Sequence, residues 1–181
     1  TDTIASAGMI GRNSEGQALL CGEKNGKIIQ GFNLGNSISE YSEENVKGKI
    51  LVFNSTNGTP SLMKSKFARN CAVLGFINME RVVSYLLDMK EDFIVLCAGK
   101  DGDFSLEDTV CAGMLISLLT SKAAPGAYVL TDSSLGASRL YSAYKNDLLK
   151  MLYDSEHGQY LVSQGFESDL AECAKVDKYN L

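Results

Sequence analysis

The chain has 181 residues and a formal net charge of −5, with 17 Lys and Arg against 22 Asp and Glu. Hydrophobic residues make up 45% and charged residues 22%, which excludes a disordered or collagen-like protein. The acidic balance argues against nucleic-acid binding by phosphate neutralisation. No apolar run approaches the roughly 20 residues that span a bilayer, and the length predicts a single domain over 1–181. We therefore expect a globular protein with no nucleic-acid partner and no membrane partner.

The cysteines and the histidine limit the metal and redox chemistry. The five cysteines include no C-x-x-C pair, which excludes a zinc ribbon or a thioredoxin motif. Four of them lie in apolar stretches, so we expect reduced, mostly buried thiols in a reducing, cytoplasmic compartment. The single histidine, His157, excludes a triple-histidine metal site. Oxygen ligands would therefore hold any divalent ion, which favours Mg²⁺ over Zn²⁺.

Apolar runs alternate with amphipathic stretches along the chain. Short runs bounded by turn residues predict buried strands, and apolar residues at helical spacing predict helices. In chain order the pattern predicts a helix over 2–10, a glycine-rich meander over 18–41, a strand over 49–54, a helix over 61–69, a strand over 71–78, a helix over 79–89, a strand over 92–98, a helix over 106–119, a loop over 121–138 and a helical tail. The glycines of the meander fit either tight turns or a backbone that approaches a ligand closely. Repeated strand–helix units imply an α/β fold with parallel strands and crossover helices.

Polar stretches follow the carboxyl ends of the predicted strands. STNGT follows the first strand at 55–59, and AGKDGDFSLED follows the third at 98–108, whereas the opposite ends carry ordinary charged connectors. Ligands of parallel α/β sheets bind outside the carboxyl ends of the strands. We therefore expect the two stretches, together with Asn78 at the end of the second predicted strand, to line one pocket.

Several residues at these ends have both a structural and a chemical interpretation. STNGT is either a turn or a cradle for an anion at the start of a helix. Glu107 and Asp108 either complement the helix dipole after Ser105, the expected N-cap, or hold Mg²⁺ and act as acid and base. Cys97 is either a buried structural thiol or a nucleophile.

Four segments together resemble, in order and spacing, the 2-phosphosulfolactate phosphatase family. The resemblance runs from about residue 18 to the end of the chain and is weakest over 121–138. The segments are GEKNGKIIQGFNLGNSISEY, NSTNGT, CAGKDGDFSLEDTVCAG and SEHGQYLVSQGFESDLAECAKVD. The resemblance implies a layered α/β/α fold with a mostly parallel sheet. It also implies Mg²⁺-dependent hydrolysis of 2-phospho-3-sulfolactate to 3-sulfolactate and phosphate, a step towards coenzyme M.

The resemblance assigns roles to individual residues. It implies that Glu107 and Asp108 hold the metal, and with Glu23 and Cys97 they form our predicted catalytic set. The predicted substrate-binding residues are Asn36, Ser37, Thr56, Asn57, Gly58, Thr59 and Lys24. The expected partner is a small anionic phosphorylated substrate. A homodimer is a further expectation, although no stretch of sequence identifies an interface.

Three departures from the family pattern support a second hypothesis. The family opens with a strand ending in an Asp-x-Leu-Arg-Ala-Thr-like motif that has no match here, so we expect an N-terminally incomplete domain. Pro60 follows Thr59 where the family continues to an arginine, and Lys24 replaces an arginine, although lysine cannot make a bidentate contact. A non-catalytic anion-binding or assembly relative of the same fold is the alternative to a phosphatase.

Overall fold

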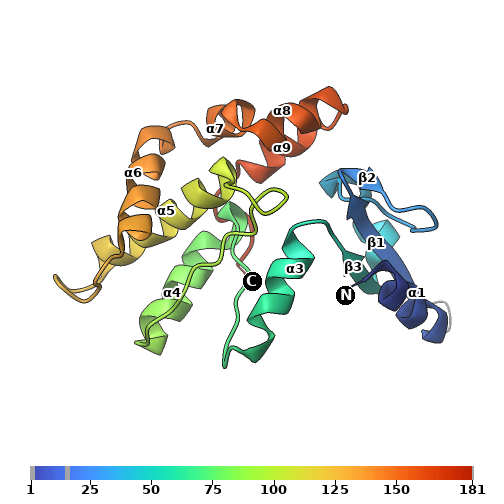
Figure 1. Cartoon of the computed structure of the whole chain (residues 1–181), viewed down its shortest axis with the longest axis horizontal. Coiled ribbons are helices and arrows are strands. Elements are labelled where there is room, and N and C mark those ends of the chain that lie inside the picture. Colours follow the sequence, from blue (N-terminus) through green and yellow to red (C-terminus); the bar gives the residue numbers. More distant parts are fainter. Residues whose placement is uncertain (1–2, 15–16, 181) are drawn as a thin grey trace. The chain divides into compact units, whose positions relative to one another are not determined.

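The computed structural model describes residues 3–14 and 17–180. These residues divide into two compact units, Thr1–Arg69 and Asn70–Leu181, and we describe each unit by itself (Figure 1). The prediction of one domain, incomplete at its N-terminus, stays a prediction.

The first unit is built on a three-stranded sheet of order β2-β1-β3. β1 pairs in parallel with β3 from Ala18↔Ile50 to Gly22↔Asn54, and β2 pairs antiparallel with the end of β1. The elements are α1 (Ile4–Asn13), β1 (Ala18–Lys24), β2 (Lys27–Ile28), η1 (Ile38–Glu40), α2 (Glu43–Val46), β3 (Ile50–Asn54), α3 (Gly58–Lys64) and η2 (Ser65–Phe67).

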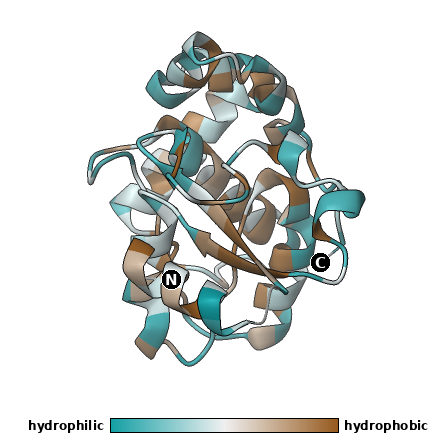
Figure 2. Cartoon of the chain, turned by 90° about the vertical axis from the view of Figure 1, so that its right-hand side faces the viewer, coloured by the Kyte–Doolittle hydropathy of each residue, from teal (hydrophilic) through white to brown (hydrophobic). Residues whose placement is uncertain are grey.

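Apolar side chains explain why this sheet forms. Cys21 and Val52, on the two parallel strands, are buried, and the strands are mostly brown in the hydropathy colouring of Figure 2. Helix α1 packs against β1 and β3. Thr3 caps α1 by accepting a hydrogen bond from the Ser6 amide. The α/β class is confirmed, and the small sheet is mixed, with β1 parallel to β3 and antiparallel to β2. The prediction of a mostly parallel sheet stays a prediction.

The second unit is helical in the structure. Its elements are η3 (Phe76–Asn78), α4 (Met79–Met89), α5 (Leu106–Lys122), α6 (Asp132–Tyr144), α7 (Leu148–Asp154), α8 (Glu156–Ser163) and α9 (Glu167–Cys173). Their core includes Val83, Leu115, Met151 and Leu170, each at most 2% exposed. The helix predicted over 79–89 is confirmed, and the one predicted over 106–119 continues three residues further, with Ser105 as its N-cap.

Two predicted strands are absent from this unit. Residues 71–75 and 92–99 carry no strand, and residues 76–78 form a 3-10 helix instead. The predictions over 71–78 and 92–98 are therefore wrong for the described residues. A strand needs a hydrogen-bonded neighbour, and no strand is present between 70 and 180 to provide one. Val73 and Ile94 consequently remain 66% and 92% exposed.

The predicted loop and the predicted thiol burial also need correction. Helices α5 and α6 occupy both ends of 121–138, so the connector is limited to 123–131. Of the five cysteines only Cys21 is buried, and Cys71, Cys97 and Cys173 are exposed. Cys71 and Cys97 lie in the segments 71–78 and 92–98, which form no strand, so no neighbouring strand covers their side chains.

No helix in 3–14 or 17–180 is both long enough and apolar enough to cross a membrane.

Candidate functional site

Polar residues from three segments meet at the carboxyl edge of the sheet in the first unit. Cys21 of β1 pairs in parallel with Phe53 of β3 and, through an isolated bridge, with Leu34. The residues that follow these three therefore emerge at the same edge. Four buried polar side chains, each at most 9% exposed, lie in these following residues: Glu23, Ser37, Asn54 and Thr59. The structure thus brings the predicted residues of 23–37 and 55–59 together.

The strands approach closely where this edge begins. Gly22 has φ +130°, and a Cβ added to it would lie 1.7 Å from the backbone oxygen of Asn54. Only glycine suits both the conformation and the space. The glycine of the GEK motif is therefore required by the packing of β1 on β3, independently of any ligand.

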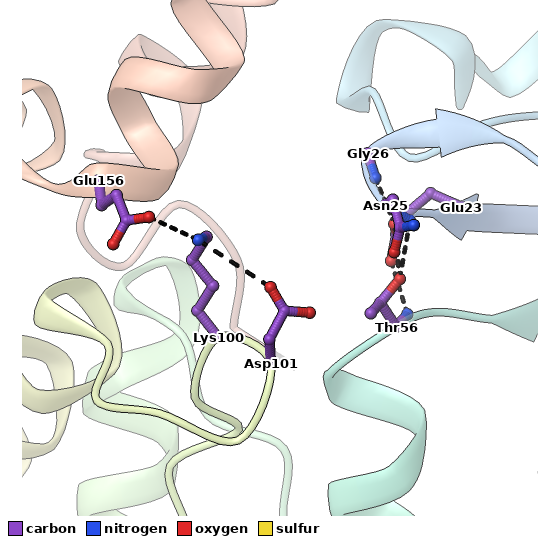
Figure 3. Close-up of polar contacts among 7 residues, drawn as sticks. All are labelled: Glu23, Asn25, Gly26, Thr56, Lys100, Asp101 and Glu156. Carbon is purple, nitrogen blue, oxygen red and sulfur yellow. Dashed lines mark hydrogen bonds and ion pairs between the residues drawn. The ribbon is translucent and has the colours of Figure 1, made fainter.

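Glu23 connects two turns at this edge (Figure 3). Its Oε1 accepts a hydrogen bond from the Thr56 amide at 2.6 Å, and its Oε2 accepts from the Thr56 hydroxyl at 2.9 Å and from the Gly26 amide at 2.7 Å. The Asn25 amide in turn donates to Thr56 Oγ1 at 3.0 Å. We call Glu23, Asn25, Gly26 and Thr56 the Glu23 clasp. The adjacent Lys24 is exposed.

Reciprocal hydrogen bonds fix the STNGT turn. The Ser55 amide donates to Thr59 Oγ1 at 2.9 Å, and the Thr59 amide donates to Ser55 Oγ at 3.0 Å. Thr59 therefore uses its hydroxyl within the turn. Asn57 lies between the two fixed residues Thr56 and Thr59 and is half-buried.

The LGNS segment is held by its own hydrogen bonds. The Gly35 amide donates to Glu40 Oε2 at 2.7 Å, and the Tyr41 hydroxyl donates to the Gly35 carbonyl oxygen at 2.6 Å. Burial and the neighbouring Cys21 raise the pKa of Tyr41, so its hydroxyl stays protonated and remains a donor. Ser37 lies 2.9 Å from the Ser39 hydroxyl, while Asn36 is exposed.

In the second unit, the start of α5 holds the other predicted residues. Ser105 caps the helix by accepting a hydrogen bond from the Asp108 amide at 3.2 Å. Asp108 Oδ2 accepts from the Gly99 amide at 2.8 Å, which ties the preceding loop to the helix. The half-buried side chain of Glu107 makes no hydrogen bond or ion pair with any described residue. Glu107 is therefore the carboxylate available for a ligand here.

A tight turn before α5 presents a lysine. Lys100 and Asp103 exchange backbone hydrogen bonds, and Asp101 and Gly102 between them both have positive φ, the pattern of a two-residue hairpin turn. Lys100 Nζ lies 2.6 Å from Glu156 Oε1, at the start of α8 (Figure 3). That hydrogen bond raises the pKa of Lys100 and lowers the pKa of Glu156.

The thiol chemistry at this helix argues against a nucleophilic Cys97. Although the residue is exposed overall, removal of water from around its sulphur raises the thiol pKa, and the carboxylate of Asp108 raises it further. Burial likewise raises the pKa of Cys111 to about 12. Both thiols are therefore protonated at neutral pH, and a protonated thiol is a poor nucleophile.

An open apolar cavity in the second unit does not coincide with these polar groups. It has a volume of about 1260 Å³ and lies beside residues 91–97, α5 and α6. Phe93, Ile116 and Leu140 are among its lining residues, whereas Glu107 and Asp108 are not. A lining of this kind suits an apolar group, so we take the polar loops of each unit, considered by itself, as the candidate ligand-binding groups. No group of three or more His, Cys, Asp or Glu in the described ranges is arranged to hold a metal.

The architecture is that of an α/β protein with buried polar groups at the carboxyl ends of parallel strands, the usual ligand site of the class. The profile of the family described as 2-phosphosulpholactate phosphatase matches residues 1–181. The chain belongs to this family, which is one of phosphoric monoester hydrolases.

Curated relatives carry the same name. A probable 2-phosphosulfolactate phosphatase of Thermotoga maritima is 37% identical over 161 residues, which cover 89% of this chain and 67% of the relative. Proteins of the same name from Symbiobacterium thermophilum and Carboxydothermus hydrogenoformans are 38% and 39% identical, over 91% and 88% of this chain. The matches cover 70% and 64% of those two relatives.

Sequence reasoning missed the connections between the predicted residues. The predicted site residues do not include Ser55, although a serine four residues before Thr59 at the start of a helix is a signal for a local hydrogen bond within the turn. Sequence reasoning gave no role to Lys100, whose partner Glu156 lies 56 residues further along the chain. The shared pocket of 55–59 and 98–108 stays a prediction, as do the catalytic and substrate-binding roles.

Proposed function

We propose that this protein hydrolyses 2-phosphosulfolactate, or a closely similar small phospho-acid, with the help of Mg²⁺. The match of the family profile over 1–181 carries this proposal. The relatives of that name, at 37% and 38% identity, support it. The predicted site residues add support because Asn36, Ser37 and Asn57 lie at the strand end where such ligands bind.

The donor chemistry at the start of α5 fits Mg²⁺. This ion is usually bound by one or two carboxylates together with water and substrate phosphate, so it does not require a cluster of three protein ligands. Neighbouring residues on a helix point about 100° apart, and Asp108 already accepts the Gly99 amide. We therefore assign Glu107 as the main ligand and Asp108 as a second ligand that also fixes the loop. Bound Mg²⁺ would supply neutralisation of phosphoryl charge.

A phosphate-release assay with 2-phosphosulfolactate tests this proposal. We expect turnover that a chelator abolishes and that added Mg²⁺ restores. Glu107→Gln should lower kcat/KM by at least about 100-fold, because the lost charge stabilisation amounts to several kcal/mol. The matched control is Glu43→Gln, which changes an exposed carboxylate paired with Lys47 and should leave turnover unchanged.

The main alternative is an anion-binding relative without turnover. Pro60, which stands in place of an arginine in the family pattern, and the protonated thiol of Cys97 favour it. Calorimetry would distinguish the two functions: heat of binding for 2-phosphosulfolactate without phosphate release would support the alternative. Magnesium-dependent turnover by the purified protein would exclude it.

A further inference from the structure

The Glu23 carboxylate is nearly saturated with donors. It accepts hydrogen bonds from the Thr56 amide, the Thr56 hydroxyl and the Gly26 amide at 2.6 to 2.9 Å. A carboxylate offers about four acceptor positions, and the residue is only 9% exposed. Few acceptor positions of the Glu23 carboxylate are therefore left for a substrate or a water molecule.

The same hydrogen bonds also occupy the donors of Thr56. Its amide and its hydroxyl both point to Glu23, and its hydroxyl oxygen accepts the Asn25 amide at 3.0 Å. A phosphate at Thr56 would have to compete with a buried negative charge for these donors. The donors of Thr56 and the acceptor oxygens of Glu23 are thus used on each other, and neither residue is arranged to bind an anion directly.

The clasp does have a mechanical consequence for its neighbours. Thr56 is fixed by Glu23, and Thr59 is fixed through its exchange of hydrogen bonds with Ser55. Asn57 and Gly58 lie between these two anchored positions, so the clasp and the Ser55–Thr59 hydrogen bonds together set their backbone path. Preorganised loops of this kind matter because small misplacements of a binding group lower the rate strongly.

We propose that Glu23 is a positioning residue that orders the Ser55–Thr59 loop through Thr56 and does not itself exchange a proton with substrate. This inference rests on the proposed phosphatase function. It also identifies Thr56 as part of the positioning device rather than as a direct ligand of the substrate.

A double-mutant cycle with pH profiles tests the proposal. Glu23→Gln replaces an acceptor oxygen with an amide donor that would face donors. Thr56→Val replaces the hydroxyl with a methyl group and keeps the backbone amide. We expect each change to lower kcat/KM by up to about 100-fold, with an unaltered shape of the pH profile. Because both changes break the same clasp, the double variant should stay within about threefold of the weaker single variant. The exposed Glu43→Gln is the matched control.

Two results would overturn the proposal. One is loss of the acid limb of the kcat/KM profile in Glu23→Gln, which would mark Glu23 as a titrating base. The other is multiplication of the two single losses in the double variant. Thr56→Val keeps the test available if Glu23→Gln does not fold. If the wild-type protein shows no turnover, the proposed function fails by itself. The cycle is then measured by urea unfolding, where additive free-energy changes would refute the clasp.

Discussion

The two units differ in whether their predicted strands have a hydrogen-bonded neighbouring strand. In the first, β1 and β3 pair over five residue positions, and the polar groups beyond them are buried and hydrogen-bonded. In the second, the segments predicted as strands carry no ladder, and Ile94 is 92% exposed. Apolar sequence alone therefore does not make a strand. A partner backbone decides whether such a run pairs or remains an uncovered connector.

The largest expected effect tests the close approach in the first unit. Gly22→Ala should destabilise by about 3 kcal/mol or more, because it combines a positive φ with a backbone clash. Its control is Gly31→Ala, at φ +85° with open space around the added Cβ, for which about 1 kcal/mol is expected. Urea unfolding measures both. Equal losses would show that the contact with Asn54 does not constrain β1.

A matched glycine pair tests the helical packing of the second unit. A Cβ on Gly113 of α5 would lie 2.0 Å from the Ala137 oxygen of α6, whereas Gly136 of α6 meets nothing within 4 Å. Gly113→Ala should cost about 1 to 3 kcal/mol through overpacking. Gly136→Ala should stabilise the helix by up to about 1 kcal/mol. Thermal unfolding of the two variants should move in opposite directions, and a shared direction would contradict this packing.

A smaller effect tests the uncovered segment directly. Because Ile94 is almost fully exposed, Ile94→Thr should change the free energy of unfolding by less than about 0.5 kcal/mol. Leu115→Ala, in the core at 2% exposure, should cost about 2 to 5 kcal/mol and serves as the reference. A loss above about 2 kcal/mol for Ile94→Thr would show that residues 92–98 are covered in solution, and the contrast between the two units would disappear.

The smallest effect concerns an exposed charge cluster. Hydrogen bonds from Lys175 and Lys178 lower the pKa of Glu172 from 4.5 to about 2. A lowered pKa in the folded state stabilises the fold above the unfolded pKa, and this contribution is lost as the pH falls towards the folded value. Glu172→Gln should therefore be slightly less stable than the wild type near neutral pH, and the difference should shrink as the pH falls through this window. A difference that grows on acidification would contradict the assignment.

The sequence predicts a set of candidate site residues but not the hydrogen bonds among them. The motifs around Glu23, Thr56 and Glu107 point to the phosphatase family, and family membership confirmed that resemblance. The partner of Glu23 lies 33 residues away, so no local pattern could tell a reacting carboxylate from one engaged by amide donors. Cys97 illustrates the same limit, because its raised pKa depends on Asp108 and on the packing around its sulphur.

Local patterns in the sequence determined the helices over 79–89 and 106–119, the Ser105 cap and the strand that ends at Asn54, since apolar spacing and end-capping act within a few residues. Only the tertiary structure decided which extended runs pair, which cysteines are covered and what Glu23 binds. Those outcomes depend on groups that folding brings from distant parts of the chain, and each hydrogen bond needs its partner within about 3 Å.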